Sequence, residues 1–167
     1  MNVFGLRAPS QIAPAADGGV TFGQLYSVQP FANDLVTQTL TGAELKAVLE
    51  QGFDANQPVQ FLSPSQGFSY SVDMARPEGQ RVVAMTLDGV PIDPAKGYRV
   101  TTNSFLANGG DSFSLLMGQR DKAIGITDID ALEAWLKTDP PRPAPVEDRV
   151  IDLNPAVTPK KPGPMTK

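Results

Sequence analysis

The chain has 167 residues, with a hydrophobic fraction of 41%, a charged fraction of 19% and a formal net charge of −4. This composition fits one globular domain with its own core, and the acidic balance disfavours a nucleic-acid partner, because neutralising phosphates takes an excess of Lys and Arg. The chain has no Cys and no His, which excludes Ser-His-Asp and Cys-His nucleophiles and removes the usual zinc ligands, and no apolar run reaches the 18 residues of a membrane span.

The N-terminal half begins with two helix signals that enclose a strand. Thr21 and Gln24 in "TFGQLYSV" form the Thr-x-x-Gln pattern of a capping box, in which side chain and backbone satisfy each other at a helix start. The apolar and β-branched run Leu35–Leu40 predicts a strand. It leads directly into "TGAELKAVLEQGF", where Thr41 and Glu44 form a second capping box.

Strands dominate the middle of the chain. In "GFSYSVD", Phe68, Tyr70 and Val72 alternate with serines, which predicts a strand with one buried face. Asp88-Gly89 within "RVVAMTLDGVPI" predicts a hairpin, and "GYRVTTNSF" predicts a strand that ends at Phe105. Helices and hairpins alternate without a regular βαβ rhythm, so we expect an α+β fold with a mixed β-sheet packed with helices.

The C-terminal part contains one more helix and most of the prolines. Thr127 is the predicted N-cap of the helix in "TDIDALEAWLKT". Its apolar face is predicted to consist of Ile129, Leu132, Trp135 and Leu136. The following "DPPRPAPVEDRV" is predicted to be an extended strap, because proline fixes φ and lacks an N–H donor. Residues 154–167 are predicted to be a flexible Pro/Lys-rich tail, which leaves residues 1–153 as the folded domain.

The turn Asn108-Gly109-Gly110-Asp111 is the most distinctive motif, and two interpretations of it stay open. It is either an ordinary strand-to-helix turn with Asp111 as helix cap, or a ligand site. In a ligand site, the glycines would let a ligand approach the backbone closely, and the helix start would attract its polar groups.

Three further residues have the same double interpretation. Phe105 and Phe61 are either core residues or stacking platforms for a flat ring such as a base. Arg7 in "FGLRAPS" is either a solvated surface residue or a phosphate clamp, because a guanidinium pairs with two oxygens at once.

Several ordered segments resemble the 5'-nucleotidase family. "SFLANGGDSF" is similar to the family signature Asn-Phe-Leu-Ala-x-Gly-Gly-Asp-Gly-Phe, with Ser112 in place of its last glycine. The likeness extends to "MNVFGLRAPS", where Val3-Phe4 departs from the family's Gly-Gly, and to "GGVTFGQLYSVQPFANDLVTQTLTGAELKAVLEQGF", "FLSPSQGFSYSVD" and "DIDALEAWLKTDPPRPAPVEDRV". It covers roughly residues 2 to 153, and implies a fold like the C-terminal domain of these proteins.

The resemblance also implies which residues bind the substrate. Members of the family hold the base between two phenylalanines, which map to Phe61 and Phe105. The signature aspartate maps to Asp111 and binds the ribose, with Asn108, Gly109 and Gly110 forming the turn that admits the nucleoside. The family's phosphate-binding arginine maps to Arg7. No catalytic residue, metal ligand or cofactor is expected in this chain.

The expected activity is therefore that of a larger protein. In this family a separate N-terminal metallophosphatase domain holds two divalent metal ions and hydrolyses nucleotides to nucleoside and phosphate. The present chain, expected to lack that domain, is predicted to be its substrate-binding partner in the same polypeptide and to be inactive alone. The family also implies a periplasmic or extracellular location, although this chain shows no signal peptide.

Two alternatives remain open. The domain could be a non-catalytic ligand-binding or dimerising module. It could also serve the same family chemistry on a cyclic nucleotide, a nucleotide sugar or a sulfur compound.

Overall fold

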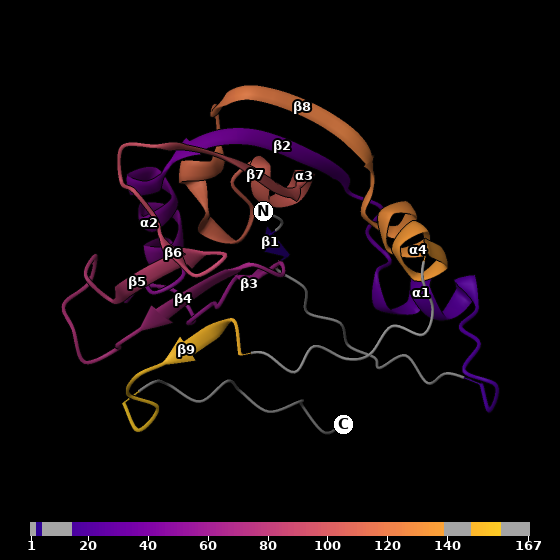
Figure 1. Ribbon diagram of the computed structural model, residues 1–167, viewed down its shortest axis with the longest axis horizontal. Coiled ribbons are helices and arrows are strands. Elements are labelled where there is room, and N and C mark those ends of the chain that lie inside the picture. The colour runs from indigo at the N-terminus through magenta and orange to yellow at the C-terminus, as the bar shows by residue number, and fades with distance from the viewer. Residues whose placement is uncertain (1–2, 5–14, 139–147, 158–167) are drawn as a thin grey trace.

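The computed structural model describes residues 3–4, 15–138 and 148–157 (Figure 1). Its helices are α1 (Phe22–Val28), α2 (Gly42–Gln51), α3 (Ser104–Ala107) and α4 (Asp128–Thr138), with two 3-10 turns, η1 (Gly110–Ser112) and η2 (Ser114–Leu116). Its strands are β1 (Val3–Phe4), β2 (Asp34–Thr41), β3 (Ser63–Pro64), β4 (Phe68–Val72), β5 (Val82–Leu87), β6 (Val90–Pro91), β7 (Gly97–Asn103), β8 (Arg120–Thr127) and β9 (Val150–Asp152).

The strands form two main sheets, of order β7-β2-β8 and β6-β5-β4-β9, and a small β1-β3 pair. Among the described residues, the strand pairings are antiparallel except that of β4 with β9, which is parallel. The described residues therefore confirm the predicted α+β fold with a mixed sheet.

Both predicted capping boxes are present and fix the helix starts. At α2, the Thr41 hydroxyl accepts a hydrogen bond from the Glu44 N–H at 3.2 Å, and the Glu44 carboxylate accepts one from the Thr41 N–H at 2.7 Å. Thr21 and Gln24 form the same reciprocal pair at α1. Thr127 accepts from the Asp130 N–H at 3.2 Å, as a cap of α4 should. Because Thr41 is both the last residue of β2 and the cap of α2, strand and helix join without a loop.

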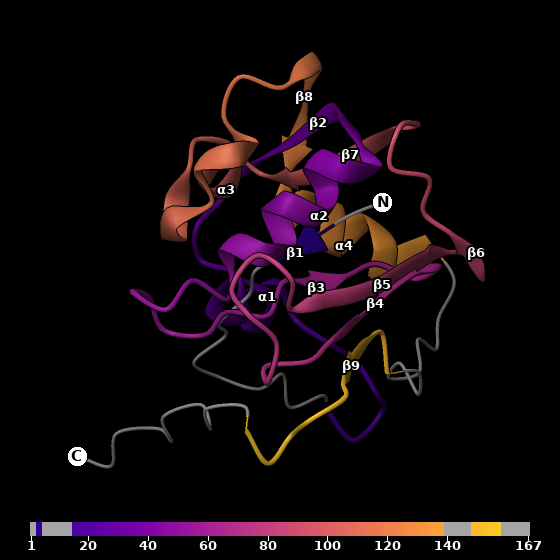
Figure 2. The ribbon, with the colours of Figure 1, turned by 90° about the vertical axis from the view of Figure 1, so that its left-hand side faces the viewer.

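The core lies between the two main sheets, and α2 fills much of the space between them (Figure 2). The predicted alternation in β4 is correct, since Phe68, Tyr70 and Val72 are buried while the serines between them are partly exposed. The predicted hairpin is also present, with Asp88 and Gly89 both at positive φ. The core residues are Leu40, Leu45, Val48, Leu49, Phe53, Leu62, Phe68, Tyr70, Val72, Val82, Val100, Leu106, Phe113 and Leu116.

The proline-rich segment can be followed only in part. Residues 139–147 of the predicted strap, and residues 158–167 of the predicted tail, lie outside the described residues. Where the chain is described again, β9 pairs with β4 in the register Tyr70↔Val150 to Val72↔Asp152. β9 lies at the edge of this sheet, next to β4.

Two predicted element boundaries were wrong. β7 ends at Asn103 and not at Phe105, because the Asn103 side chain accepts a hydrogen bond from the Leu106 N–H at 2.9 Å and starts the one-turn helix α3. The helix expected after the Gly-Gly-Asp turn consists of the two short turns η1 and η2. Phe105 therefore lies in a helical turn and not at the end of a strand.

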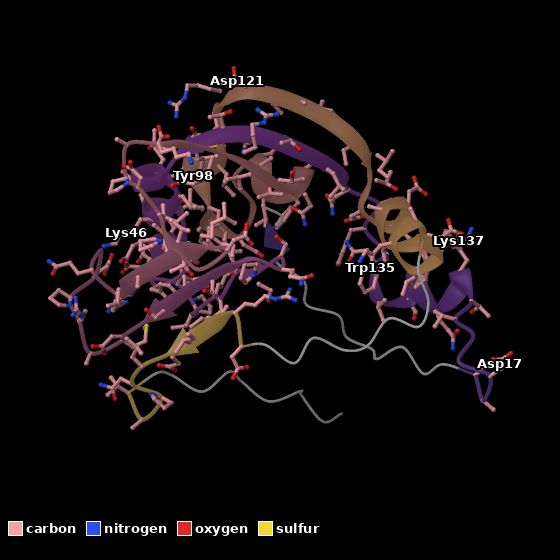
Figure 3. The ribbon with its side chains drawn as sticks, viewed as in Figure 1. Asp17, Lys46, Tyr98, Asp121, Trp135 and Lys137 are labelled. Carbon is pink, nitrogen blue, oxygen red and sulfur yellow. The ribbon has the colours of Figure 1, made fainter. Side chains whose placement is uncertain are left out.

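The predicted apolar face of α4 is only partly buried. Ile129 is buried and Leu132 and Leu136 are half-buried, whereas Trp135 is exposed. Figure 3 labels Trp135 on α4. The reason is that α4 packs beside α1 at one end of the molecule, away from the main core (Figure 1). Among the described helices, none has the length and apolar character needed to cross a membrane.

Candidate functional site

The turn Asn108–Asp111 has an unusual backbone. Gly109, Asp111 and Ser112 adopt positive φ values of 83°, 51° and 69°, and the latter two are rare for residues with a side chain. Such a conformation persists only where the surroundings enforce it. One tie comes from Gln60, whose side-chain N–H donates to the Asp111 carbonyl at 3.1 Å. The structure thus holds a strained turn at the surface.

Asp111 does not cap a helix. It lies inside η1 in the left-handed region, and η1 has no side-chain cap. Its side chain is exposed and makes no hydrogen bond or ion pair within the described part of the chain. Asn108 beside it is exposed as well. The turn therefore offers a carboxylate and an amide to solvent, which removes the main support for a purely structural role.

Both glycines are explained by close packing in the turn. A Cβ on Gly110 would lie 2.5 to 2.6 Å from three ring atoms of Phe105, so the ring rests directly on this backbone. A Cβ on Gly109 would lie 3.0 Å from the sulfur of Met117, at a φ that disfavours any side chain. Phe105 nevertheless remains 50% exposed. The sequence therefore builds an aromatic surface that is supported on glycine and lies beside an exposed carboxylate.

Phe61 belongs partly to the core. It is half-buried, packs against the core cluster and meets Phe53 edge-to-face, with ring centroids 5.2 Å apart. Its neighbour Gln60 makes the hydrogen bond to Asp111 described above. The structure therefore brings the Phe61 segment to the turn but gives its ring a packing role as well.

A third aromatic, Phe31, is not among the site residues predicted from the sequence. Its side chain is 64% exposed. Two residues further on, Asn33 accepts a hydrogen bond from the hydroxyl of Ser104, the residue before Phe105, at 3.2 Å. Leu35 and Asn103 are register partners in β2 and β7, so the loop before β2 and the helix after β7 lie side by side. The available signal was the aromatic in "QPFAND", placed between a helix end and a strand.

Neither Arg7, the remaining predicted site residue, nor a cleft beside α2 adds to the group formed by the phenylalanines and Asp111. Arg7 lies outside the described residues. A cleft of about 530 Å³ lies beside α2, and none of the predicted site residues lines it. Its lining residues are Ala43, Lys46, Ala47, Glu50, Gln51, Asp54, Glu78 and Gly79. Gln51 also bonds to Ser114 and to the Leu115 N–H, so this cleft borders η2.

The described residues contain no group of three or more acidic side chains that could hold a metal ion, and the chain has no Cys or His. They therefore do not fit a pair of catalytic metals. The site instead combines apolar rings, a glycine turn and single polar groups, an arrangement suited to binding a small molecule.

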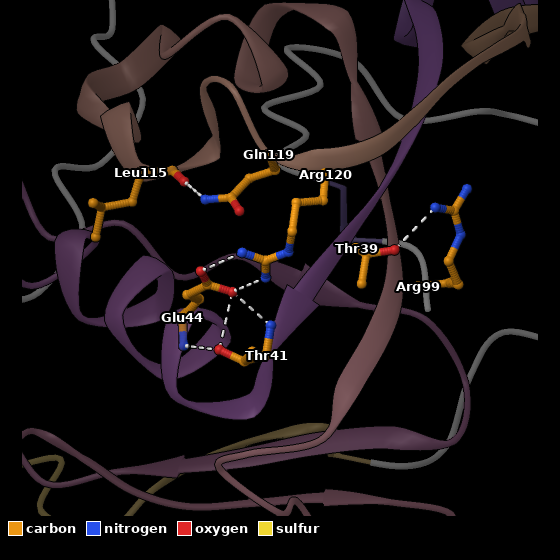
Figure 4. Close-up of polar contacts among 7 residues, drawn as sticks. All are labelled: Thr39, Thr41, Glu44, Arg99, Leu115, Gln119 and Arg120. Carbon is orange, nitrogen blue, oxygen red and sulfur yellow. Dashed lines mark hydrogen bonds and ion pairs between the residues drawn. The ribbon is translucent and has the colours of Figure 1, made fainter.

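A charged link lies at the end of the β7-β2-β8 sheet where β2 joins α2 (Figure 4). Arg120 donates two hydrogen bonds to the Glu44 carboxylate, at 3.1 and 2.5 Å, and so ties β8 to the start of α2. These bonds, with the one from the Thr41 N–H, lower the pKa of Glu44 from its usual 4.5 to about 2. The contact with Glu44 also raises the pKa of Arg120. This link supports the fold and lies apart from the turn Asn108–Asp111 and from Phe105.

Comparison with known proteins identifies the family. Residues 1–118 match the family described as "5'-nucleotidase, C-terminal domain". The chain belongs to this family.

Individual relatives and a solved structure show the same likeness. An apyrase of Tabanus yao is 32% identical over 90% of the chain, and a trifunctional nucleotide phosphoesterase protein of Bacillus subtilis is 31% identical over 72% of it. The crystal structure of a 5'-nucleotidase precursor from Thermus thermophilus superimposes on 92% of the chain with a TM-score of 0.78 and 36% identity. The chain spans 28%, 9% and 31% of the lengths of these three proteins. It therefore corresponds to one part of much longer 5'-nucleotidase-like proteins.

Proposed function

We propose that this chain is the nucleotide-binding specificity domain of a metal-dependent 5'-nucleotidase-like phosphoesterase, which hydrolyses nucleotides to nucleoside and phosphate. The observation that carries the proposal is the exposed ring of Phe105 on Gly110, next to the exposed carboxylate of Asp111. An aromatic face binds a base by stacking, and a carboxylate accepts hydrogen bonds from the hydroxyls of a ribose. Family membership and the nucleotide-directed names of relatives support the same ligand class.

The base would stack on Phe105, and a second ring would cover its other face. Phe61 is one candidate for this second ring, but its edge-to-face contact with Phe53 leaves it partly buried. Phe31 is more exposed and lies on the loop tied to Ser104, so the geometry favours it. Asp111 would bind the ribose, and Asn108, Gly109 and Gly110 would form the wall beside it.

The hydrolytic step is assigned to another domain of the same polypeptide, a metallophosphatase domain N-terminal to this one. The present domain would orient the nucleotide so that its phosphate reaches the catalytic centre, which lowers the entropic part of the barrier. Arg7 is proposed to contact the phosphate. A periplasmic or extracellular location is proposed from the family resemblance.

Calorimetric titration with adenosine tests this assignment. We expect the chain to bind adenosine, and Phe105→Ala to weaken binding on the order of 1–3 kcal/mol, because one stacking surface is lost. Phe31→Ala should weaken binding similarly. Phe61→Ala should instead act mainly by lowering the melting temperature, because it removes a ring packed on the core.

Ile124→Ala is the matched control. Ile124 is 68% exposed on β8, so its removal takes away exposed apolar surface that belongs to none of the proposed site residues. It should leave the affinity for adenosine unchanged. Absence of adenosine binding, or equal affinity in folded Phe105→Ala and wild type, would refute the proposed binding role.

A further inference from the structure

The loop that carries Phe31 is anchored by two buried polar residues from different helices. Gln29 ends α1 as its C-cap, and Asp128 is the first residue of α4. Their side chains are 2% and 3% exposed, and the Gln29 side-chain N–H donates a hydrogen bond to the Asp128 carboxylate. This bond joins positions 99 residues apart in the sequence. It holds the two helix ends together directly beside the Phe31 loop.

The other end of the loop is fixed by the same helix start. The backbone N–H of Asp128 donates to the Asn33 carbonyl at 2.8 Å, and the Asn33 side chain receives the bond from Ser104. Between these anchors, Ala32 has a φ of 47°, in the left-handed region that residues with a side chain rarely adopt. A short loop with fixed ends and a strained residue has few conformations available. The Phe31 ring in its middle is therefore presented in a restricted position.

The two anchoring residues are not fully satisfied. Gln29 Oε1 and Asp128 Oδ1 are buried and have no hydrogen-bond partner. A buried polar atom without a donor destabilises a fold, and apolar residues of similar size would join two helices without that penalty. What a hydrogen bond adds to apolar contact is a defined direction. The pair is therefore better explained by a need for exact placement of the loop than by stability.

We infer that Gln29 and Asp128 are positioning residues for nucleobase binding. They hold Phe31 beside Phe105 and so control the affinity for the base without touching the ligand. This inference rests on the proposed function, because it takes Phe31 as one of the rings that contact the base. It extends that function to the contact between α1 and α4, which anchors the Phe31 loop.

The test compares Gln29→Met with Asp128→Asn. Gln29→Met keeps the length of the side chain but removes the donor, and we expect the Kd for adenosine to rise about tenfold at a temperature where the variant is folded. In Asp128→Asn the amide oxygen still accepts from Gln29, so the Kd should stay within about twofold of wild type. Equal losses in both variants would contradict an anchoring hydrogen bond.

A double-mutant cycle separates positioning from general destabilisation. In a Phe31→Ala background, Gln29→Met should weaken adenosine binding little further, because the ring that it positions is already absent. If the loss persists in full in that background, the positioning role is refuted. Glu50→Gln is the matched control. Glu50 is also buried, and accepts hydrogen bonds from the Arg81 and Val82 N–H groups away from the loop, so this change should lower the melting temperature without changing adenosine affinity.

Hydrogen exchange provides a second measurement that needs no ligand. The Asp128 amide, which donates to Asn33, should exchange faster in Gln29→Met than in wild type, while amides of Leu45 to Leu49 in α2 stay protected. Unchanged exchange at Asp128 would refute the anchoring role even if wild type failed to bind adenosine. Failure of wild type to bind adenosine, with faster exchange in the variant, would refute the proposed function and its consequence for affinity, but not the anchor.

Discussion

Asp111 combines a strained backbone with a side chain that has no partner among the described residues. Gly adopts a φ of 51° most easily, and Asn and Asp are among the residues with a side chain found there most often, so Asp111 meets a small backbone cost without gaining a helix cap. We therefore expect the carboxylate to serve ligand binding, and its replacement separates that role from folding.

We expect Asp111→Asn to melt close to wild type and to bind adenosine more weakly. Asn adopts the left-handed region readily, and the lost bonds to a charged acceptor are worth roughly 1.5–3 kcal/mol. The measurement is a titration with adenosine and with its 2',3'-dideoxy analogue, alongside thermal melts. The analogue should bind wild type poorly and lose little further in the variant, because the ribose contact is already absent. A variant that melts far lower but binds adenosine normally when folded would make Asp111 a purely structural residue.

At the scale of elements, the link between β8 and α2 gives the fold a pH dependence. The pKa of Glu44 is about 2 in the folded chain, below its usual value of 4.5, chiefly because Arg120 donates hydrogen bonds to the carboxylate. The unfolded chain therefore binds more protons than the folded chain between these values. The stabilisation is complete above about pH 4.5 and is lost as the pH falls towards 2.

We accordingly expect Glu44→Gln to flatten the dependence of unfolding free energy on pH in this window, by up to about one proton in slope. Arg120→Gln should remove most of the same part of the slope, and the double variant should add little, because both changes break one contact (Figure 4). Urea unfolding at several pH values between 2 and 6 measures these slopes. A Glu44→Gln profile parallel to that of wild type would rule out this carboxylate as the source.

The elements differ in how far the sequence predicts them, and the difference follows the range of the interactions. The capping boxes at Thr21 and Thr41 and the Asp88-Gly89 hairpin depend on residues within a few positions of one another, and all three were predicted correctly. The predicted end of β7 was wrong because the helix cap by Asn103 competes with continued pairing to β2. The strand propensity of these residues does not decide that competition.

The candidate site was only partly predictable for the same reason. Phe105 and Asp111 belong to one short motif, so the motif itself pointed to them. The loop of Phe31 and the helix of Phe105 lie side by side because Leu35 pairs with Asn103 across β2 and β7. The Gln29–Asp128 bond likewise needs α1 and α4 to be packed together. Neither contact can be predicted from residues that are close in sequence. The role of the site residues in binding stays a prediction.

At the scale of the whole molecule, we predict that the chain binds but does not hydrolyse. It has no His or Cys, and its described residues include no cluster of three or more acidic side chains that could hold a metal ion. The purified chain should release no phosphate from AMP, even with added Mn²⁺, Co²⁺ or Zn²⁺, while a longer protein that includes the proposed metallophosphatase domain should do so. Metal-dependent phosphate release by the chain alone, above a heat-inactivated control, would place catalytic residues within it.

The parallel pairing of β9 with β4 has a consequence for how the domain is made. Tyr70 and Val150 are register partners although 80 residues separate them. The ribosome must therefore synthesise almost all of this domain before the sheet of β6, β5 and β4 gains β9. Until then β4 presents an unpaired edge, the kind of edge along which strands of other chains add and nascent proteins aggregate. The short strand β9 thus acts late in biogenesis, as the segment that closes this edge against neighbouring chains.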